Sequence, residues 1–97
     1  MITGKQRSYL KKLAHDLDPI VFIGKNDLTE NIIKEIDSLL ELRELVKVKI
    51  QEGSLLDAKD AANEVADMLE AEFVQAIGRK FVLYRRAKDD PQIVLPK

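Results

Sequence analysis

Apolar residues recur every three or four positions in three segments of the chain, the spacing that places side chains on one face of an α-helix. In the first segment these residues are Leu10, Leu13, Ala14 and Leu17. Thr3 followed by Gln6 has the spacing of a capping box, which satisfies free backbone N–H groups at a helix start. We therefore expect a helix over about residues 4–16. Asp18-Pro19 ends it, because the residue before a proline avoids the helical region.

Two further helices are expected in the middle of the chain. The apolar residues of the second are Leu28, Ile32, Ile36, Leu39 and Leu40, and those of the third are Ala58, Ala61, Ala62, Val65 and Leu69. Asp27 paired with Glu30, or Thr29 on its own, has the position of an N-cap for the second helix, which we expect to end near residue 42. Ser54 with Asp57 has the corresponding spacing before the third helix.

Four short segments have the character of strands. Residues 20–23 are all apolar, which predicts a short strand buried on both faces. In residues 45–50, Val46, Val48 and Ile50 alternate with Lys47 and Lys49, the period of a strand with one covered face. Residues 73–77 and 81–85 flank Gly78-Arg79-Lys80 and so predict a hairpin.

The resulting order, α-β-α-β-α-β-β, predicts a compact α/β fold with a mixed four-stranded sheet whose first two strands are parallel. We expect the three helices mainly on one face, which leaves the other face open with Lys47 and Lys49 on it. The chain has the size of one domain, residues 1–97. Residues 86–97 are a polar tail in which Ile93-Val94-Leu95 forms a short edge strand or docks loosely.

The residue inventory argues against an enzyme. The chain has no cysteine and one histidine, His15, so it offers no thiolate chemistry and no histidine-based metal site or catalytic relay. A phosphate-cradling loop of the G-x-x-x-x-G-K-[ST] type is also absent. We expect no catalytic residues, no metal and no cofactor. No apolar run approaches a membrane span and no signal peptide is recognisable, so we expect a cytoplasmic protein without a membrane partner.

Charge is unevenly distributed along the chain. The net charge is −1, yet residues 1–25 carry +3, residues 26–72 carry −8 and residues 73–97 carry +4. The basic side chains that cluster without neighbouring acids are Lys5, Lys11, Lys12, Lys25, Lys47, Lys49, Arg79, Lys80 and Arg85. Such clusters favour binding to a polyanion, because phosphate contacts supply most sequence-independent affinity for nucleic acids.

The acidic middle of the chain supports a second hypothesis. The second and third predicted helices carry Glu30, Asp37, Glu41, Asp60, Glu64 and Asp67. These side chains fit a protein-interaction module that contacts a ribosomal or other basic protein. Charge reversals in the basic set and in the acidic set would distinguish the two hypotheses.

Several motifs in this order resemble a CRM domain, the chloroplast RNA splicing and ribosome maturation domain, and in particular its free-standing bacterial YhbY-like members. The motifs are Leu13-Ala14-His15, Pro19, Ile23-Gly24-Lys25-Asn26, residues 44–50, and residues 74–78 with 82–85. The resemblance implies a fold similar to the C-terminal domain of translation initiation factor three. It also implies an RNA-binding protein that acts on large-subunit (50S) ribosomal RNA or its precursor.

The family's characteristic loop is G-x-x-G, and the matching residues here are Gly24-Lys25-Asn26-Asp27, with an aspartate in place of the second glycine. The resemblance implies that Gly24, Lys25 and Asn26 contact RNA, and we place Lys5 and Lys12 of the first helix beside this loop. Asp27 is expected to cap the second helix while Asn26 takes any left-handed conformation that the turn requires. The mixed charge favours a monomer.

Overall fold

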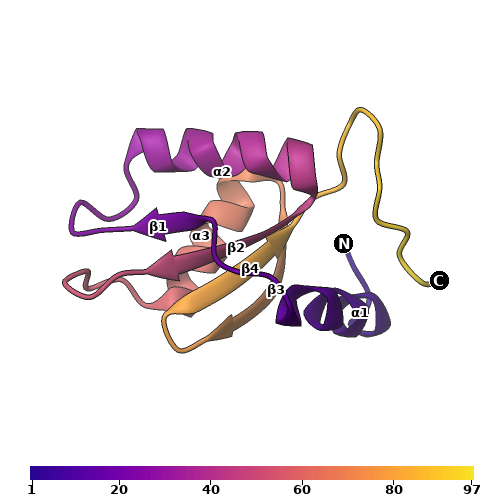
Figure 1. Ribbon diagram of the computed structural model, residues 1–97, viewed down its shortest axis with the longest axis horizontal. Coiled ribbons are helices and arrows are strands. Elements are labelled where there is room, and N and C mark those ends of the chain that lie inside the picture. Colours follow the sequence, from indigo (N-terminus) through magenta and orange to yellow (C-terminus); the bar gives the residue numbers. More distant parts are fainter.

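The computed structural model describes residues 1–97 and contains seven elements in the predicted order (Figure 1). The helices are α1 (Gly4–His15), α2 (Glu30–Arg43) and α3 (Ala58–Leu69), and the strands are β1 (Val21–Ile23), β2 (Leu45–Ile50), β3 (Glu72–Ile77) and β4 (Lys80–Tyr84). The longest helix has 14 residues, and none is both long and apolar enough to cross a bilayer.

The four strands form one mixed sheet in the order β1-β2-β4-β3, so the predicted α/β fold is confirmed. β1 runs parallel to β2, whereas β4 is antiparallel to both β2 and β3. β3 and β4 are joined by the two-residue turn Gly78-Arg79, in which Gly78 has a φ of 60°. The strand order places β1 and β3 at the two edges of the sheet.

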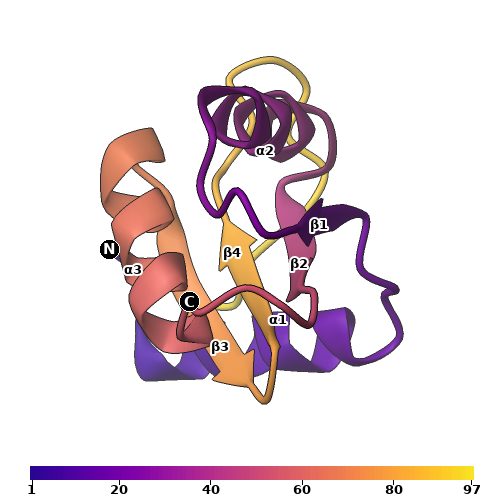
Figure 2. The same cartoon turned by 90° about the vertical axis from the view of Figure 1, so that its left-hand side faces the viewer.

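The helices lie on both faces of the sheet. α2 and α3 cover the first face, where Val48, Ile50 and Phe81 belong to the main core. α1 crosses the second face, where Leu10 and Ala14 form a smaller core with residues of β2, β3 and β4 (Figure 2). Most of the helical cover is therefore on one face, as predicted, but the expectation that the other face is open is wrong. α1 has its own apolar stripe, and burying that stripe requires a surface that α2 and α3 have already filled on the first face.

The helix starts follow local capping chemistry. The predicted capping box of Thr3 and Gln6 is present, and Thr29 caps α2 by accepting a hydrogen bond from the Ile32 N–H. The expectation that Ser54 belongs to the cap of α3 is wrong. Asp57 caps that helix through the N–H of Asp60, while the Ser54 hydroxyl contacts the loop between β1 and α2.

Glu44 is the single residue between α2 and β2, and it holds the C-terminal tail. Its φ is 66°, a left-handed value that a β-carbon makes costly, and its side chain is 1% exposed. The carboxylate accepts hydrogen bonds from the backbone N–H groups of Ala87, Gln92 and Ile93 at 2.7–2.9 Å. Burial raises the pKa of the Glu44 carboxyl, but these three donors and Arg86 outweigh it and hold the pKa below its usual value.

The rest of the tail is held by neighbouring contacts without forming a strand. Ile93 and Leu95 pack against the smaller core, and the Gln6 side chain donates to the Pro96 carbonyl at 3.0 Å. The half-buried Glu41 carboxylate accepts hydrogen bonds from the backbone N–H groups of Asp89 and Lys88, which lower the pKa of Glu41. Of the two arrangements left open by the sequence, docking without strand pairing is therefore the one observed.

We predict that Glu44→Gln lowers the free energy of unfolding at neutral pH by about 2 kcal/mol, because an amide nitrogen replaces one acceptor facing buried N–H groups. The folded-state pKa of Glu44 is depressed, so its contribution is present above its ordinary value near 4.5 and is lost as the pH falls through the folded pKa. Urea unfolding across the acidic range should show a shallower acid loss of stability for the variant. Glu52→Gln, at an exposed carboxylate, is the control and should match the wild type. Equal acid sensitivity of wild type and Glu44→Gln would contradict the assignment.

Candidate nucleic-acid interface

Three connections meet at the end of the sheet where the parallel strands β1 and β2 finish (Figure 1). The Ile50 N–H donates to the Arg79 carbonyl at 2.7 Å, which ties β2 to the β3–β4 turn. The Gln51 N–H donates to the Ile23 carbonyl at 2.8 Å, which ties the β2–α3 connection to the end of β1. We call this end the basic end and define it by its four cationic residues, Lys25, Lys49, Arg79 and Lys80.

Two of these lysines stand side by side on neighbouring strands, on the same face of the sheet, and neither has a counter-ion. Lys49 of β2 is the direct cross-strand partner of Lys80 on β4, and both are exposed. The three ion pairs of the structure all lie elsewhere, at Met1–Glu72, Lys34–Glu30 and Arg85–Asp37. Like charges directly opposite each other destabilise a strand pair, so a bound anion would remove an electrostatic cost of the free protein.

Lys25 is positioned by a glycine of the neighbouring connection. The aliphatic stem of Lys25 lies over Gly53, where an added β-carbon would come within 3.3 Å of the Lys25 Cε. Gly53 also has a φ of 99°, which disfavours any other residue. The stem is thus supported while the residue remains exposed together with Asn26.

The loop formed by residues 24–27 keeps a left-handed position although it lacks the second glycine. Asp27 itself has a φ of 59°, so the expectation that Asn26 takes this conformation is wrong. The Asp27 carboxylate accepts a hydrogen bond from the Ser54 hydroxyl at 2.7 Å, and the Asp27 N–H donates to the Gly24 carbonyl at 3.0 Å. Aspartate is among the residues that visit this region at tolerable cost. Asp27 therefore fixes the loop to the β2–α3 connection instead of capping α2.

Lys47 is engaged within the protein. Its ammonium donates to the carbonyls of Ala14 and Leu17, at 3.2 and 3.1 Å. These carbonyls lie at the C-terminal end of α1, where a cation interacts favourably with the helix dipole. Lys47 shares a strand with Lys49, as predicted, but the structure uses it to hold α1 on the second face.

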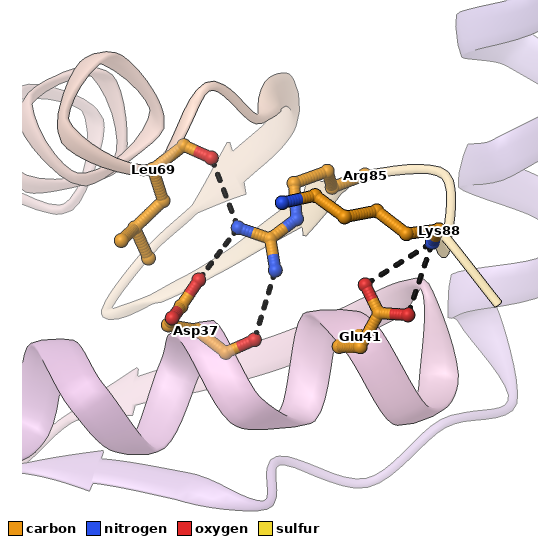
Figure 3. Close-up of polar contacts among 5 residues, drawn as sticks. All are labelled: Asp37, Glu41, Leu69, Arg85 and Lys88. Carbon is orange, nitrogen blue, oxygen red and sulfur yellow. Dashed lines mark hydrogen bonds and ion pairs between the residues drawn. The ribbon is translucent and has the colours of Figure 1, made fainter.

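Arg85 is also engaged within the protein. Its guanidinium lies between α2 and α3, where it donates to the Asp37 carboxylate at 2.7 Å and to the Asp37 and Leu69 carbonyls at 3.0 Å each (Figure 3). The side chain is only 18% exposed. Since both terminal nitrogens of its guanidinium donate to these groups, Arg85 is not available to a ligand at the basic end.

The lysines of α1 lie in a different part of the surface. α1 lies toward the other end of the sheet from the β1–α2 loop, so the expectation that Lys5 and Lys12 stand beside that loop is wrong (Figure 1). Both are exposed. Lys11 lines a groove along the edge strand β3 with Arg7 and Lys59. This groove extends to Ile77, the cross-strand partner of Lys80, and so reaches the basic end.

An exposed aromatic ring stands beside the lysines, contrary to the prediction that residues 20–23 are buried on both faces. Val21 and Ile23 are fully buried, but Phe22 points to the second face and is 48% exposed. α1 does not cover this end of that face. The run of four apolar residues gave no signal of this, because an uninterrupted run does not reveal which side of the strand is covered.

Comparison with known proteins identifies relatives that match this chain over nearly its whole length. The CRS1 / YhbY (CRM) domain family matches residues 2–85. The chain is 41% identical over 96 residues to "Probable RNA-binding protein YqeI" of Bacillus subtilis, with 99% of this chain and 100% of that protein covered. It is 38% identical over 96 residues to "RNA-binding protein" of Haemophilus influenzae, with 99% and 96% covered. The solution structure of a hypothetical protein from Staphylococcus aureus matches with a TM-score of 0.83 and 46% identity, covering 99% of this chain and 100% of that one.

We predict that Asp27 and Ser54 are energetically coupled. Ser54→Ala should lower the free energy of unfolding by about 1–2 kcal/mol in the wild type, and by clearly less when Asp27 is already glycine. Asp27→Gly alone should have a small effect, because relief of the left-handed backbone offsets the lost hydrogen bond. Urea unfolding of the two single variants and the double variant measures the coupling. Effects that add within about 0.5 kcal/mol would show that the contact contributes nothing.

Proposed function

Because this chain belongs to the CRS1 / YhbY (CRM) domain family, we propose that it is a non-enzymatic RNA-binding protein whose contact surface is centred on the basic end. The relatives from Bacillus subtilis and Haemophilus influenzae are named as RNA-binding proteins. The local chemistry agrees with this proposal, because the basic end presents cations and an aromatic ring. The carboxyls with shifted pKa values, Glu41 and Glu44, instead bind backbone N–H groups of the tail.

The observation that carries the proposal is that Lys49 and Lys80 are neighbours on adjacent strands and that neither forms an ion pair. Lys25 and Arg79 lie at the same end of the sheet. Segments far apart in the sequence are brought together there, and none of the four cations is in an ion pair. Such an arrangement attracts closely spaced phosphates of a nucleic-acid backbone. Gly24 and Asn26 add backbone and amide groups beside Lys25, and Lys11 extends the basic surface along β3.

We further propose that the RNA is large-subunit ribosomal RNA or its precursor, bound during assembly of the 50S subunit by a cytoplasmic monomer. This target follows from the resemblance to the free-standing bacterial CRM proteins. Point contacts by lysines to phosphates carry little sequence information. Recognition of one ribosomal element would therefore depend on the shape of the RNA and on its unpaired nucleotides.

A protein partner is the second candidate, and the placement of the acidic helices favours it. α2 and α3 lie together on the first face, away from the lysines of the second face. Asp37 and Glu41 are already used within the protein, whereas Glu64 and Asp67 of α3 are exposed and form no ion pair. A basic ribosomal protein contacting α3 would leave the basic end free for RNA.

We predict that Lys49→Glu with Lys80→Glu weakens binding to a single-stranded RNA by at least about tenfold at moderate salt. Two phosphate contacts are lost, so the slope of log affinity against log salt should become shallower by about 1.4, from roughly −3 for four contacts. Fluorescence anisotropy of a labelled RNA across a salt series measures both quantities. The two lysines are exposed on the sheet, so circular dichroism should show an unchanged fold.

The matched control is Lys88→Glu with Lys97→Glu, which changes the net charge equally but lies in the exposed C-terminal tail, at the opposite end of the molecule from the basic end (Figure 1). Its affinity should stay within about threefold of the wild type, since charges beyond a Debye length are largely screened. Equal losses in the two double variants would show that overall charge, and not the basic end, determines binding.

For the ribosomal target, we predict that the protein tagged in cells sediments with precursors of the large subunit and crosslinks to large-subunit RNA. The Lys49→Glu, Lys80→Glu variant should lose both signals. Glu64→Lys with Asp67→Lys tests the second candidate: loss of particle association with normal binding to purified RNA would assign the acidic helices to a protein contact. Crosslinks confined to small-subunit or messenger RNA would contradict the ribosomal target while leaving RNA binding intact.

A further inference from the structure

One complete row of the sheet lies exposed at the basic end. The strand register places Phe22 beside Lys49, Lys49 beside Lys80, and Lys80 beside Ile77. Directly paired residues point to the same face, so all four side chains stand on the second face of the sheet. With neighbouring strands about 4.8 Å apart, the row is roughly 14 Å wide. It thus consists of two central cations flanked by an aromatic and an aliphatic side chain.

Phe22 is unusual within its own strand. Its neighbours Val21 and Ile23 belong to the main core, whereas Phe22 belongs to neither core and leaves about half of its surface in water, 48%. At the other end of the row Ile77 is 69% exposed. Burying a phenylalanine side chain is worth about 2 kcal/mol, so the fold gives up part of that stabilisation here.

The position of Phe22 relative to the cations suggests what it contacts. It directly adjoins Lys49, and the chain continues from it through Ile23 into the loop that carries Lys25. A flat ring beside Lys49, one residue before the loop that carries Lys25, offers a surface for a planar group attached to an anionic backbone. An unpaired nucleotide has both features, because its base has a π-face and its phosphates carry the charge.

We infer that Phe22 stacks on an unpaired base while Lys49 and Lys80 contact the adjoining phosphates, so that the ligand of this row is single-stranded RNA. The inference rests on the proposed RNA-binding function and specifies the class of RNA. In a duplex the bases are stacked on each other, so a duplex offers the lysines its phosphates but offers Phe22 no free base. An acidic peptide would likewise satisfy the lysines without using the ring.

The absence of tryptophan from the chain allows a local test. In Phe22→Trp the single indole should be strongly quenched by a single-stranded RNA of about ten nucleotides, and only weakly by a duplex of equal length or by polyglutamate. Met68→Trp is the control, because Met68 is 53% exposed on α3, which covers the first face, and its indole should respond to none of the three ligands.

Affinities measured by anisotropy complete the test. Phe22→Leu keeps an apolar side chain but removes the aromatic ring, and should weaken single-strand binding about tenfold with little effect on duplex binding. Phe22→Tyr should bind within about twofold of the wild type. Ile77→Leu is the matched control at the other end of the row and should also be unchanged. Because Phe22 lies outside both cores, thermal unfolding of these variants should remain close to that of the wild type.

The outcomes separate this inference from the function on which it rests. Wild-type affinity for Phe22→Leu, or equal quenching of Phe22→Trp by single strand, duplex and polyglutamate, would overturn the stacking role. If Lys49→Glu with Lys80→Glu still lost binding in that case, the basic end would remain the RNA interface. No binding of the wild type to any RNA would overturn both.

Discussion

The hydrogen bonds accepted by Glu44 are the contacts on which the arrangement of this fold most depends. A single residue joins α2 to the central strand β2, so its left-handed backbone determines how the helix turns back onto the sheet. Its carbonyl accepts from the Arg85 N–H at the end of β4, and its carboxylate accepts three N–H groups of the tail. A buried carboxylate is tolerable only when it is satisfied in this way, since burial alone would favour its neutral form. The same residue thereby fixes the positions of α2, β2, the end of β4 and the tail relative to one another.

The cations of this protein divide into two groups that composition does not distinguish. Lys47 holds the end of α1, and Arg85 joins α2 to α3. Their donors are directed at specific carbonyls and a carboxylate, so displacing them toward a ligand would leave buried or partly buried acceptors unsatisfied. Lys25, Lys49 and Lys80 have no such partners. Binding at the basic end therefore requires no rearrangement of the interior, and its cost is confined to ordering exposed side chains.

Local patterns were sufficient to predict the elements, because each has a clear period and a clear boundary. The stripe of α1, the alternation of β2 and the Thr3–Gln6 capping box all depend on residues a few positions apart. The side of the sheet that each helix covers depends instead on competition for apolar surface, and for that reason the position of α1 was predicted incorrectly. The same limit applies to the site: Lys49 and Lys80 are 31 positions apart, and only the register between β2 and β4 brings them together. Phe22 was missed because its exposure is decided by where α1 ends on the second face, not by its neighbours in the sequence.

The loop with Asp27 shows how a family position can change its residue and keep its conformation. In the G-x-x-G loop implied by the resemblance, glycine meets the left-handed backbone without strain and adds no charge. Here the backbone is still left-handed, and the contact with Ser54 compensates the cost of the β-carbon. That contact draws the new carboxylate toward the β2–α3 connection, so the negative charge has a partner within the protein instead of facing the ligand alone. In the proposed interface, the loop itself offers a phosphate less than a second glycine would, and we propose that the lysines of the adjoining row supply a larger share of the binding. An interface that extends from the loop onto the sheet is the arrangement that this substitution favours.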